Sequence, residues 1–484
     1  MLFNSYEFIF VFLPITFFIF FYLNEKRLIV ASKAFLVFAS LFFYAWWNVI
    51  YLPLILISMI FNYTIGKNLT DSKNKKFLLT FGIVVNILLL AYFKYSDFFI
   101  QNINLITHSH IHLLHLALPL AISFFTFQQI SYLVDSYKNE TKEYNFLNYA
   151  LFVTFFPQLI AGPIVHHKEM MPQFSKISNL AKNYRNIALG LFIFTIGLFK
   201  KVVIADSFAF WANAGFDEAT TLNFLEAWIT SLSYTFELYF DFSGYTDMAI
   251  GVALLFNIKL PINFNSPYKA VSIQDFWRRW HITLSRFLRD YIYIPLGGNR
   301  LGEFRVYNNL MITFLIGGLW HGAGWTFVFW GFLHGLALII HRIWQKVNIK
   351  LNNFIAWFIT FNFINISWVF FRAKTWDDAI KVLKGMFTLK DNIILPTALE
   401  DKVPALLTNS LNIKYDNFLV GIHGGVDTIL WIIVGFVLVL FCKNSNEIAK
   451  EFKPNLFYAL FASVLIFYIS ISMGVKSEFL YFNF

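Results

Sequence analysis

Cysteine is almost absent from this sequence of 484 residues, in which Cys442 is the single example. No disulfide can form within the chain, and no CxxC or Cys/His spacing supplies the ligands of a structural zinc site. Charged residues are also scarce, at 14%, whereas hydrophobic residues make up 58%. A water-soluble domain carries considerably more charge than this. The composition therefore indicates a chain whose main solvent is lipid.

Two familiar catalytic loops are missing as well. The sequence has neither a GxSxG nucleophile elbow nor a Walker phosphate loop, so neither a serine hydrolase nor an ATP-driven pump is indicated. The formal charge of +10 does not indicate nucleic acid binding, because the lysines and arginines occupy short loops between apolar runs. That distribution is typical of the cytoplasmic loops of a membrane protein.

Apolar runs of spanning length follow one another along the chain. Because roughly 20 helical residues cross the hydrocarbon core, we predict spans at 8–23, 28–46, 49–66, 77–93, 116–134, 186–205, 222–240, 354–371, 428–441 and 456–473. We expect an all-α polytopic membrane protein with about ten or more transmembrane helices, plus re-entrant and amphipathic interfacial helices. Lys26 and Arg27 follow the first run, so the positive-inside rule places the N-terminus outside the cytoplasm. We expect both termini on that side.

The apolar stretch 148–165 is interrupted by Pro157, Gly162 and Pro163. Proline removes a helical hydrogen bond, so a straight span is not expected here. A re-entrant segment that helps to wall a pocket and a kinked span fit the sequence equally well.

The longest polar interval of the chain is 372–427. We expect an extracytoplasmic elaboration there, with a short amphipathic helix over 376–387. No internal repeat is apparent, and no soluble segment is long enough to stand alone.

Polar side chains between apolar runs are costly to bury and therefore mark candidate sites. In the first such cluster, 239–247, Asp241 and Asp247 flank Ser243 and Gly244. The favoured interpretation is structural: a helix breaks at Ser243 and Gly244, and the carboxylates accept hydrogen bonds from freed backbone N–H groups. Catalysis is the second interpretation.

The second cluster, 274–298, predicts an interfacial amphipathic helix. Its apolar side chains share one helical face while its arginines lie off that face; the two groups are Trp277, Trp280, His281, Leu284, Phe287 and Leu288, and Arg278, Arg279, Arg286 and Arg289. Contact with lipid phosphates is the favoured role for the arginines, and binding the phosphates of a nucleotide-bearing donor is the other.

In the third cluster, His321 lies within Gly-Gly-Leu-Trp-His-Gly-Ala-Gly-Trp, between two apolar runs of helix length. The glycines are expected to give the backbone freedom for close approach of a substrate, and a neutral imidazole tolerates burial better than a carboxylate. His321 is therefore a candidate general base, although a buried histidine is more often structural.

Four further histidines, His108, His110, His112 and His115, cluster in a predicted loop. No carboxylate or cysteine follows them closely, so a solvated loop is favoured over a metal site. We expect no metal ion in this protein.

These clusters occur together with Leu-Pro-Leu-Ala-Ile-Ser-Phe-Phe-Thr-Phe-Gln at 118–128 and Phe-Pro-Gln-Leu-Ile-Ala-Gly-Pro-Ile at 156–164. The combination closely resembles the membrane-bound O-acyltransferase (MBOAT) family, in its bacterial alginate and peptidoglycan O-acetyltransferase-like branch. The resemblance implies one integral membrane domain, 1–484, in a bacterial inner membrane. Within it we expect a core at about 110–372, the elaboration at about 372–427 and C-terminal spans at 428–473.

The resemblance also implies roles for single residues. The histidine of the family's Trp-His-Gly element, here His321, is implied to be catalytic, and His281 to support it or to position the substrate. Contacts to substrate or donor are implied for Arg278, Arg279, Trp280, Asp290, Trp320 and His334.

The activity implied is O-acetyl transfer from cytoplasmic acetyl-CoA, without a resident cofactor. An extracytoplasmic SGNH-type partner would then modify a surface polysaccharide, either peptidoglycan or an alginate-like exopolysaccharide. Two alternatives stay open. One is D-alanyl transfer to teichoic acid, and the other is a transporter or flippase, although the inverted repeats typical of transporters are not found in the sequence.

Overall fold

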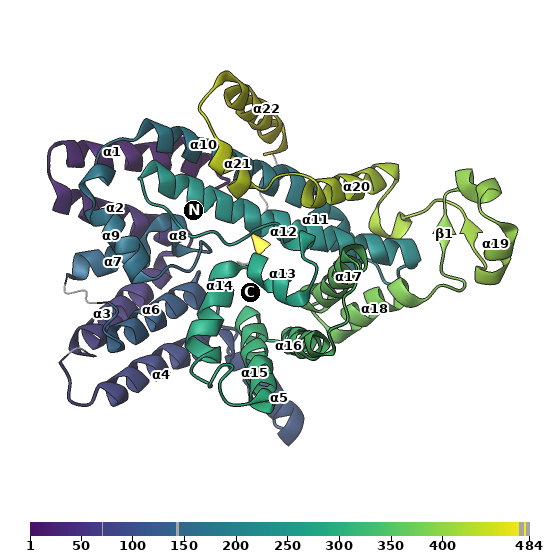
Figure 1. The fold of residues 1–484 in the computed structure, drawn as a ribbon, viewed down its shortest axis with the longest axis horizontal. Coiled ribbons are helices and arrows are strands. Elements are labelled where there is room, and N and C mark those ends of the chain that lie inside the picture. The colour runs from purple at the N-terminus through teal and green to yellow at the C-terminus, as the bar shows by residue number, and fades with distance from the viewer. Residues whose placement is uncertain (70, 142–144, 474–478, 481–484) are drawn as a thin grey trace. The chain divides into compact units, whose positions relative to one another are not determined.

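The computed structural model describes residues 1–69, 71–141, 145–473 and 479–480, and these are predominantly helical (Figure 1). They divide into two compact units. The first comprises Met1–Phe199, Gly244–Asn263 and Ile448–Phe484, and the second comprises Lys200–Ser243 and Phe264–Glu447. The all-α fold predicted from the sequence is confirmed.

Some helices of the first unit match the predicted apolar runs, whereas others, such as α5 (Ser96–Thr107) and α9 (His167–Ser175), lie between them. The helices of this unit are η1 (Glu7–Phe12), α1 (Leu13–Glu25), α2 (Ile29–Ala45), η2 (Val49–Tyr51), α3 (Leu52–Leu69), α4 (Lys75–Lys94), α5, α6 (Ile122–Tyr137), α7 (Phe146–Thr154), α8 (Phe156–Leu159), α9, η3 (Ile177–Asn179), α10 (Tyr184–Phe199) and α22 (Leu456–Ser472). The helix α12 (Phe224–Leu255) contributes residues to both units, as does α21 (Ser445–Glu451).

The second unit holds the histidines of interest. Its helices are η4 (Lys200–Ala205), α11 (Asp206–Asn213), η5 (Ala214–Glu218), η6 (Pro267–Lys269), α13 (Ile273–Arg279), α14 (Ile282–Leu288), η7 (Arg289–Tyr293), α15 (Glu303–His321), α16 (Trp325–Val347), α17 (Asn353–Arg372), α18 (Trp376–Phe387), η8 (Thr397–Lys402), α19 (Ala405–Leu411), η9 (Val420–Ile422) and α20 (Val426–Leu440). Two short strands, β1 (Ile394–Leu395) and β2 (Lys414–Tyr415), pair in parallel within the elaboration.

Among the described residues, six helices are long and apolar enough to cross a membrane, or seven if the bent pair α20 and α21 forms one span. Two further apolar helices, α2 and α22, are shorter. The number is below the expected ten partly because the runs 28–46, 116–134 and 456–473 form helices of only 17, 16 and 17 residues. The chain is nevertheless a multi-pass membrane protein by the length and composition of these helices.

The stretch 148–165 is a broken helix. It divides at Phe155, between α7 and α8. The carbonyl oxygen of Phe152 accepts hydrogen bonds from the side-chain amides of Gln128 and Gln158, at 2.8 and 2.7 Å. Because these amides satisfy backbone that the break leaves without a helical partner, the irregular segment can be buried.

The predicted break at Ser243 and Gly244 is wrong, because α12 runs through both residues without interruption. Asp241 binds a cation instead of freed backbone: its Oδ1 lies 2.7 Å from Nζ of Lys201, which also contacts Asp206 at 2.9 Å. The lysine side chain is 5% exposed and that of Asp241 1%. A buried ion pair of this kind allows a charged side chain to face a helical core.

The single amphipathic helix predicted over 274–298 is also wrong. The chain forms α13, breaks at Trp280 and His281, and continues as α14 and η7. His281 has a φ of 42°, in the left-handed region that a continuous α-helix does not use. The break turns His281 into the interior, where the ring is buried.

The hairpin of α15 and α16 carries His321 at its turn, and Figure 1 shows the two helices side by side. Glycine lets their backbones approach closely. A Cβ on Gly318 would lie 2.3 Å from the carbonyl oxygen of Phe327, and one on Gly331 would lie 2.4 Å from that of Phe314. These glycines serve helix packing, whereas the sequence had suggested that glycine near His321 admits substrate.

Candidate active site

His321 is the last residue of α15, and its side chain is buried. Three aromatic rings meet the imidazole edge to face, with centroid distances of 4.9 Å to Trp320, 5.2 Å to Trp330 and 5.0 Å to Phe371. The helix ends here because Gly322 is extended, with φ −159° and ψ 151°. The ring is therefore held by packing at a helix terminus within an apolar wall.

His281 reaches the same region from the break between α13 and α14. Its ring lies 4.7 Å from that of Phe242 and 6.2 Å from that of Trp320. Trp320 thus contacts both His281 and His321. The structure brings together the two histidines that the sequence comparison with the family had assigned to catalysis and its support.

His334, in α16, belongs to a defined hydrogen-bond chain. The indole Nε1 of Trp277 donates to Nδ1 of His334 at 3.2 Å, and Nε2 of His334 lies 3.1 Å from Oγ of Ser367. The Ser367 hydroxyl donates onward to the carbonyl of Ile364 at 2.8 Å. Since Nδ1 accepts and the serine proton is used elsewhere, the imidazole is neutral with its proton on Nε2.

Trp330 links the histidines on the other side. Its ring centroid lies 5.2 Å from that of His321 and 4.6 Å from that of His334. Trp280 is buried and packs against Trp368 at 5.1 Å, in a layer behind this cluster. We call the set His281, Trp320, His321, Trp330 and His334 the histidine cluster.

A cavity of about 530 Å³ opens beside the cluster, within the size range of small-molecule sites. Its wall includes Trp277, whose ring lies 5.9 Å from that of Trp330. Trp277 therefore separates the cavity from the histidine cluster. Arginines supply the charge of the lining, namely Arg278, Arg286, Arg289 and Arg342, and His341 lies among them.

Two carboxylates stand next to this basic lining and neutralise part of it. Asp290 accepts from Nε and Nη2 of Arg289 at 2.7 and 3.2 Å, and Glu303 accepts from Arg342 at 3.0 and 3.2 Å. Hydrogen bonds from Arg342, and then from Lys346, lower the pKa of Glu303 to about 2. Glu303 therefore stays ionised at neutral pH and holds Arg342 in place.

The two arginines predicted to bind donor phosphates have different surroundings. Arg278 is exposed and lines the cavity. Arg279 is not among its lining residues, and its Nε binds Asp275 at 2.8 Å, one helical turn earlier. Asp290 contacts Arg289 and reaches the cavity only through it.

Several contributors were not singled out from the sequence. Trp330 and Ser367 join the cluster, while His341 and Arg342 join the cavity. A signal for the cavity was present, because Leu338, His341, Arg342 and Gln345 recur at i, i+3, i+4 and i+7 on one face of α16. No comparable periodicity marks Ser367.

The arrangement can perform proton transfer next to a site for an anionic ligand. A buried imidazole can take a proton from a hydroxyl held against it, because the neutral form is favoured where water is scarce. The arginines offer planar, bidentate donors to phosphate oxygens. Among the described residues, no group of three or more His, Cys, Asp or Glu is placed to hold a metal ion.

Comparisons with known proteins identify the family of this chain. Residues 43–373 match the sequence model of MBOAT, the membrane-bound O-acyltransferase family. The chain is 51% identical to the peptidoglycan O-acetyltransferase of Helicobacter pylori, over 100% of this chain and 98% of that protein. It is 42% identical to the probable alginate O-acetylase of Pseudomonas aeruginosa, over 80% and 75% respectively. The teichoic acid D-alanyltransferase of Bacillus subtilis is 27% identical over 53% of this chain.

Proposed function

Because the chain belongs to the membrane-bound O-acyltransferase family, we propose that it transfers an acetyl group from acetyl-CoA across the inner membrane for O-acetylation of a cell-surface polysaccharide. The observation that carries the proposal is the position of His321, which is buried and is linked through Trp330 and Trp277 to a cavity lined by arginines. An O-acyltransferase needs a base at the reacting hydroxyl and a site for the donor, and we assign these roles to His321 and to the cavity.

The cavity takes the nucleotide part of the donor. Its arginines match the phosphates of CoA in charge and in hydrogen-bond geometry. The pantetheine arm then extends past Trp277, towards Trp330 and His321. We place the cavity on the cytoplasmic side, because CoA is charged and does not cross a bilayer, and both chain termini on the opposite side.

His321 acts as the general base. Its imidazole takes the proton of an acceptor hydroxyl while the oxygen attacks the thioester carbonyl, and the C–S bond breaks as the C–O bond forms. The proton then goes to the leaving thiolate of CoA. Such proton transfer contributes roughly 10²- to 10⁴-fold to a rate. His281, on the other side of Trp320, orients the acyl group.

The polymer that we favour as the final acceptor is peptidoglycan. The similarity to a peptidoglycan O-acetyltransferase is higher and covers the whole chain, whereas the similarity to alginate O-acetylases covers four-fifths of it. We further propose that an extracytoplasmic SGNH-type partner receives the acetyl group and binds the polymer.

The test of His321 is a pair of variants expressed to equal levels in the membrane. His321→Ala should abolish acetylation of the cell wall, whereas His112→Ala, at an exposed loop position, should leave it intact. Ester-linked acetate released by mild base from purified wall is the quantity to measure. If cells with a folded His321→Ala protein contain as much ester-linked acetate as the wild type, His321 is not catalytic.

The donor is tested separately with purified protein and labelled acetyl-CoA. Arg278→Gln should raise the KM for acetyl-CoA about tenfold, because a hydrogen bond to a charged group contributes about 1.5–3 kcal/mol and about 1.4 kcal/mol is a factor of ten. Arg305→Gln is the matched control, since Arg305 is exposed and is not in the cavity lining. Equal KM values for the two variants would show that the cavity is not the donor site.

A further inference from the structure

The helix α18 has two different apolar faces. Its buried face is made of small and medium side chains, Ala379, Val382, Gly385 and Met386. Its exposed face carries Trp376, Ile380 and Phe387, with 41%, 55% and 61% of each side chain accessible. At about 100° per residue these three lie within about 40° of one another around the helix axis. An ordinary surface helix is polar on its exposed side, whereas the exposed side of α18 is apolar.

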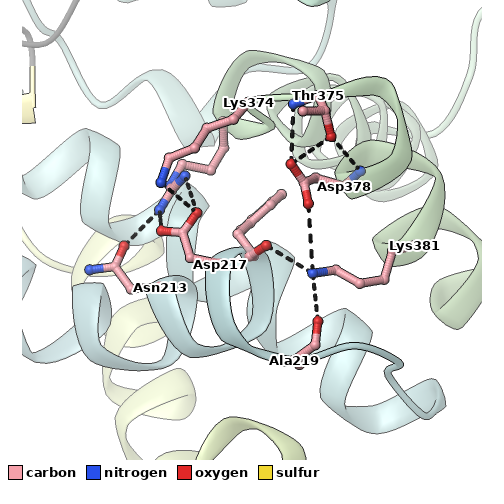
Figure 2. Close-up of polar contacts among 9 residues, drawn as sticks. Asn213, Asp217, Ala219, Lys374, Thr375, Asp378 and Lys381 are labelled. Carbon is pink, nitrogen blue, oxygen red and sulfur yellow. Dashed lines mark hydrogen bonds and ion pairs between the residues drawn. The ribbon is translucent and has the colours of Figure 1, made fainter.

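Polar contacts fix the helix on its inner side (Figure 2). Thr375 and Asp378 form a capping box, so the helix begins at Trp376. Nζ of Lys381 donates to the carbonyl oxygens of Phe216 and Ala219 at 2.8 and 2.7 Å, at the C-terminal end of η5. A cation is favourable at that end of a helix.

A second set of contacts joins two candidate spans at the base of α18. Arg372 and Lys374 both contact Asp217, at 2.5 and 3.1 Å, as Figure 2 shows for Asp217 and Lys374. Asp217 lies in the last turn of the candidate span Tyr184–Glu218, and Arg372 ends the candidate span Asn353–Arg372. Since α18 begins four residues after Arg372, it starts next to the ends of both candidate spans.

The exposed face continues an exposed apolar stripe of α16, a third candidate span. The ring of Trp376 lies 5.3 Å from that of Phe329 and 5.8 Å from that of Phe370. Phe329 shares one side of α16 with the exposed Phe332 and Leu336, at i+3 and i+7. One apolar surface therefore runs from the span onto α18.

We propose that α18 lies in the membrane interface, with Trp376, Ile380 and Phe387 inserted at the boundary between lipid headgroups and acyl chains. The occupant of the exposed face is the lipid surface. Tryptophan favours this depth because its ring is apolar and its N–H is polar. Lys384 and Lys390 are exposed near the inserted face and reach the lipid phosphates.

The test measures the depth of single nitroxide labels in the full-length protein. Cys442 is exposed and is first replaced by serine. Labels are then placed by Ile380→Cys and Phe387→Cys, and by the control Asp377→Cys, which is exposed but lies about 60° from Ile380 around the helix. The proteins are reconstituted in vesicles of phosphatidylethanolamine and phosphatidylglycerol. Collision rates with oxygen, which concentrates in lipid, and with a water-soluble nickel chelate are compared.

We expect the ratio of oxygen to nickel collision rates to be several-fold higher at positions 380 and 387 than at 377. Equal ratios with high nickel access would mean that water covers the face and would overturn the proposal. Low access to both reagents would mean that a protein covers it, which would overturn the proposal equally. The same thermal unfolding midpoint in all three labelled proteins ensures that the fold is unchanged.

Discussion

At the scale of single residues, the hydrogen bonds of His334 indicate its role in the histidine cluster. His334 uses both ring nitrogens in hydrogen bonds, to Trp277 and Ser367. It therefore positions α13, α16 and α17 around the site and is not suited to exchange protons with a substrate. Three aromatic rings pack against His321.

Ser367→Ala tests the hydrogen-bond chain of His334. The substitution leaves the buried Nε2–H of His334 without its acceptor, which should cost about 1–3 kcal/mol of stability. The thermal unfolding midpoint in detergent should fall. Ser470→Ala is the control, because Ser470 also bonds a carbonyl of its own helix but is exposed. An equal midpoint in the two variants would mean that the chain contributes nothing to stability.

A second residue-scale prediction concerns Lys201, which pairs with Asp241 in the interior. Lys201→Met leaves a buried carboxylate without its cation, and breaking a buried pair in this way costs about 3–5 kcal/mol. The double variant with Asp241→Asn should regain part of that loss. Unfolding midpoints of the single and double variants form a double-mutant cycle, and strict additivity would refute the coupling.

At the scale of elements, the hairpin of α15 and α16 determines where His321 lies. Close approach of the two helices requires a hydrogen atom at Gly318, where a Cβ would overlap Phe327 and Gly331. The same hairpin contributes Phe314 and His341 to the cavity. The proposed base and part of the proposed donor site are thus built on one pair of helices, so a shift between these helices should affect both.

Gly318→Ala should therefore separate the helices, destabilise the protein by about 1–3 kcal/mol and reduce acyl transfer. Gly324→Ala is the control, because it makes the same substitution in the turn of the same hairpin. Its added Cβ would meet nothing closer than 3.6 Å, and its backbone is extended, so any residue fits. The midpoint and the rate of transfer from labelled acetyl-CoA should change in the first variant only. A wild-type rate in Gly318→Ala would argue against this dependence.

At the scale of the whole molecule, the chain has a net charge of +10. Four of its arginines line one cavity, whereas its candidate spans are apolar. Charge on a cavity wall attracts an anionic donor over a distance of about 8–10 Å at physiological ionic strength. The field is a property of the assembled fold, because α13, α14, η7 and α16 each supply part of the lining.

The KM for acetyl-CoA should therefore rise as the salt concentration increases. Acetyl-pantetheine has the same thioester but no phosphate, so its KM should be nearly independent of salt. Steady-state rates with both donors at low and high sodium chloride check this prediction. A parallel salt dependence for the two donors would place the effect outside the cavity.

The sequence by itself indicated that the chain lies in a membrane, that its fold is all-α, and which residues are candidates for the site. Because a bilayer selects long apolar runs, the predicted spans correspond to helices such as α4 and α17, and even α18 has the bounds expected for it. His321 was identified by a local motif, and the O-acyltransferase family by the combination of motifs.

Only the tertiary structure decided which of those residues meet. It showed α12 unbroken, a helix broken at His281, Arg278 at a cavity and Arg279 bound to Asp275. Periodicity describes neighbours three or four positions apart, whereas Trp277, His334 and Ser367 come from three different helices. Their contacts follow from how closely packed helices fill space, and that is a property of the whole chain.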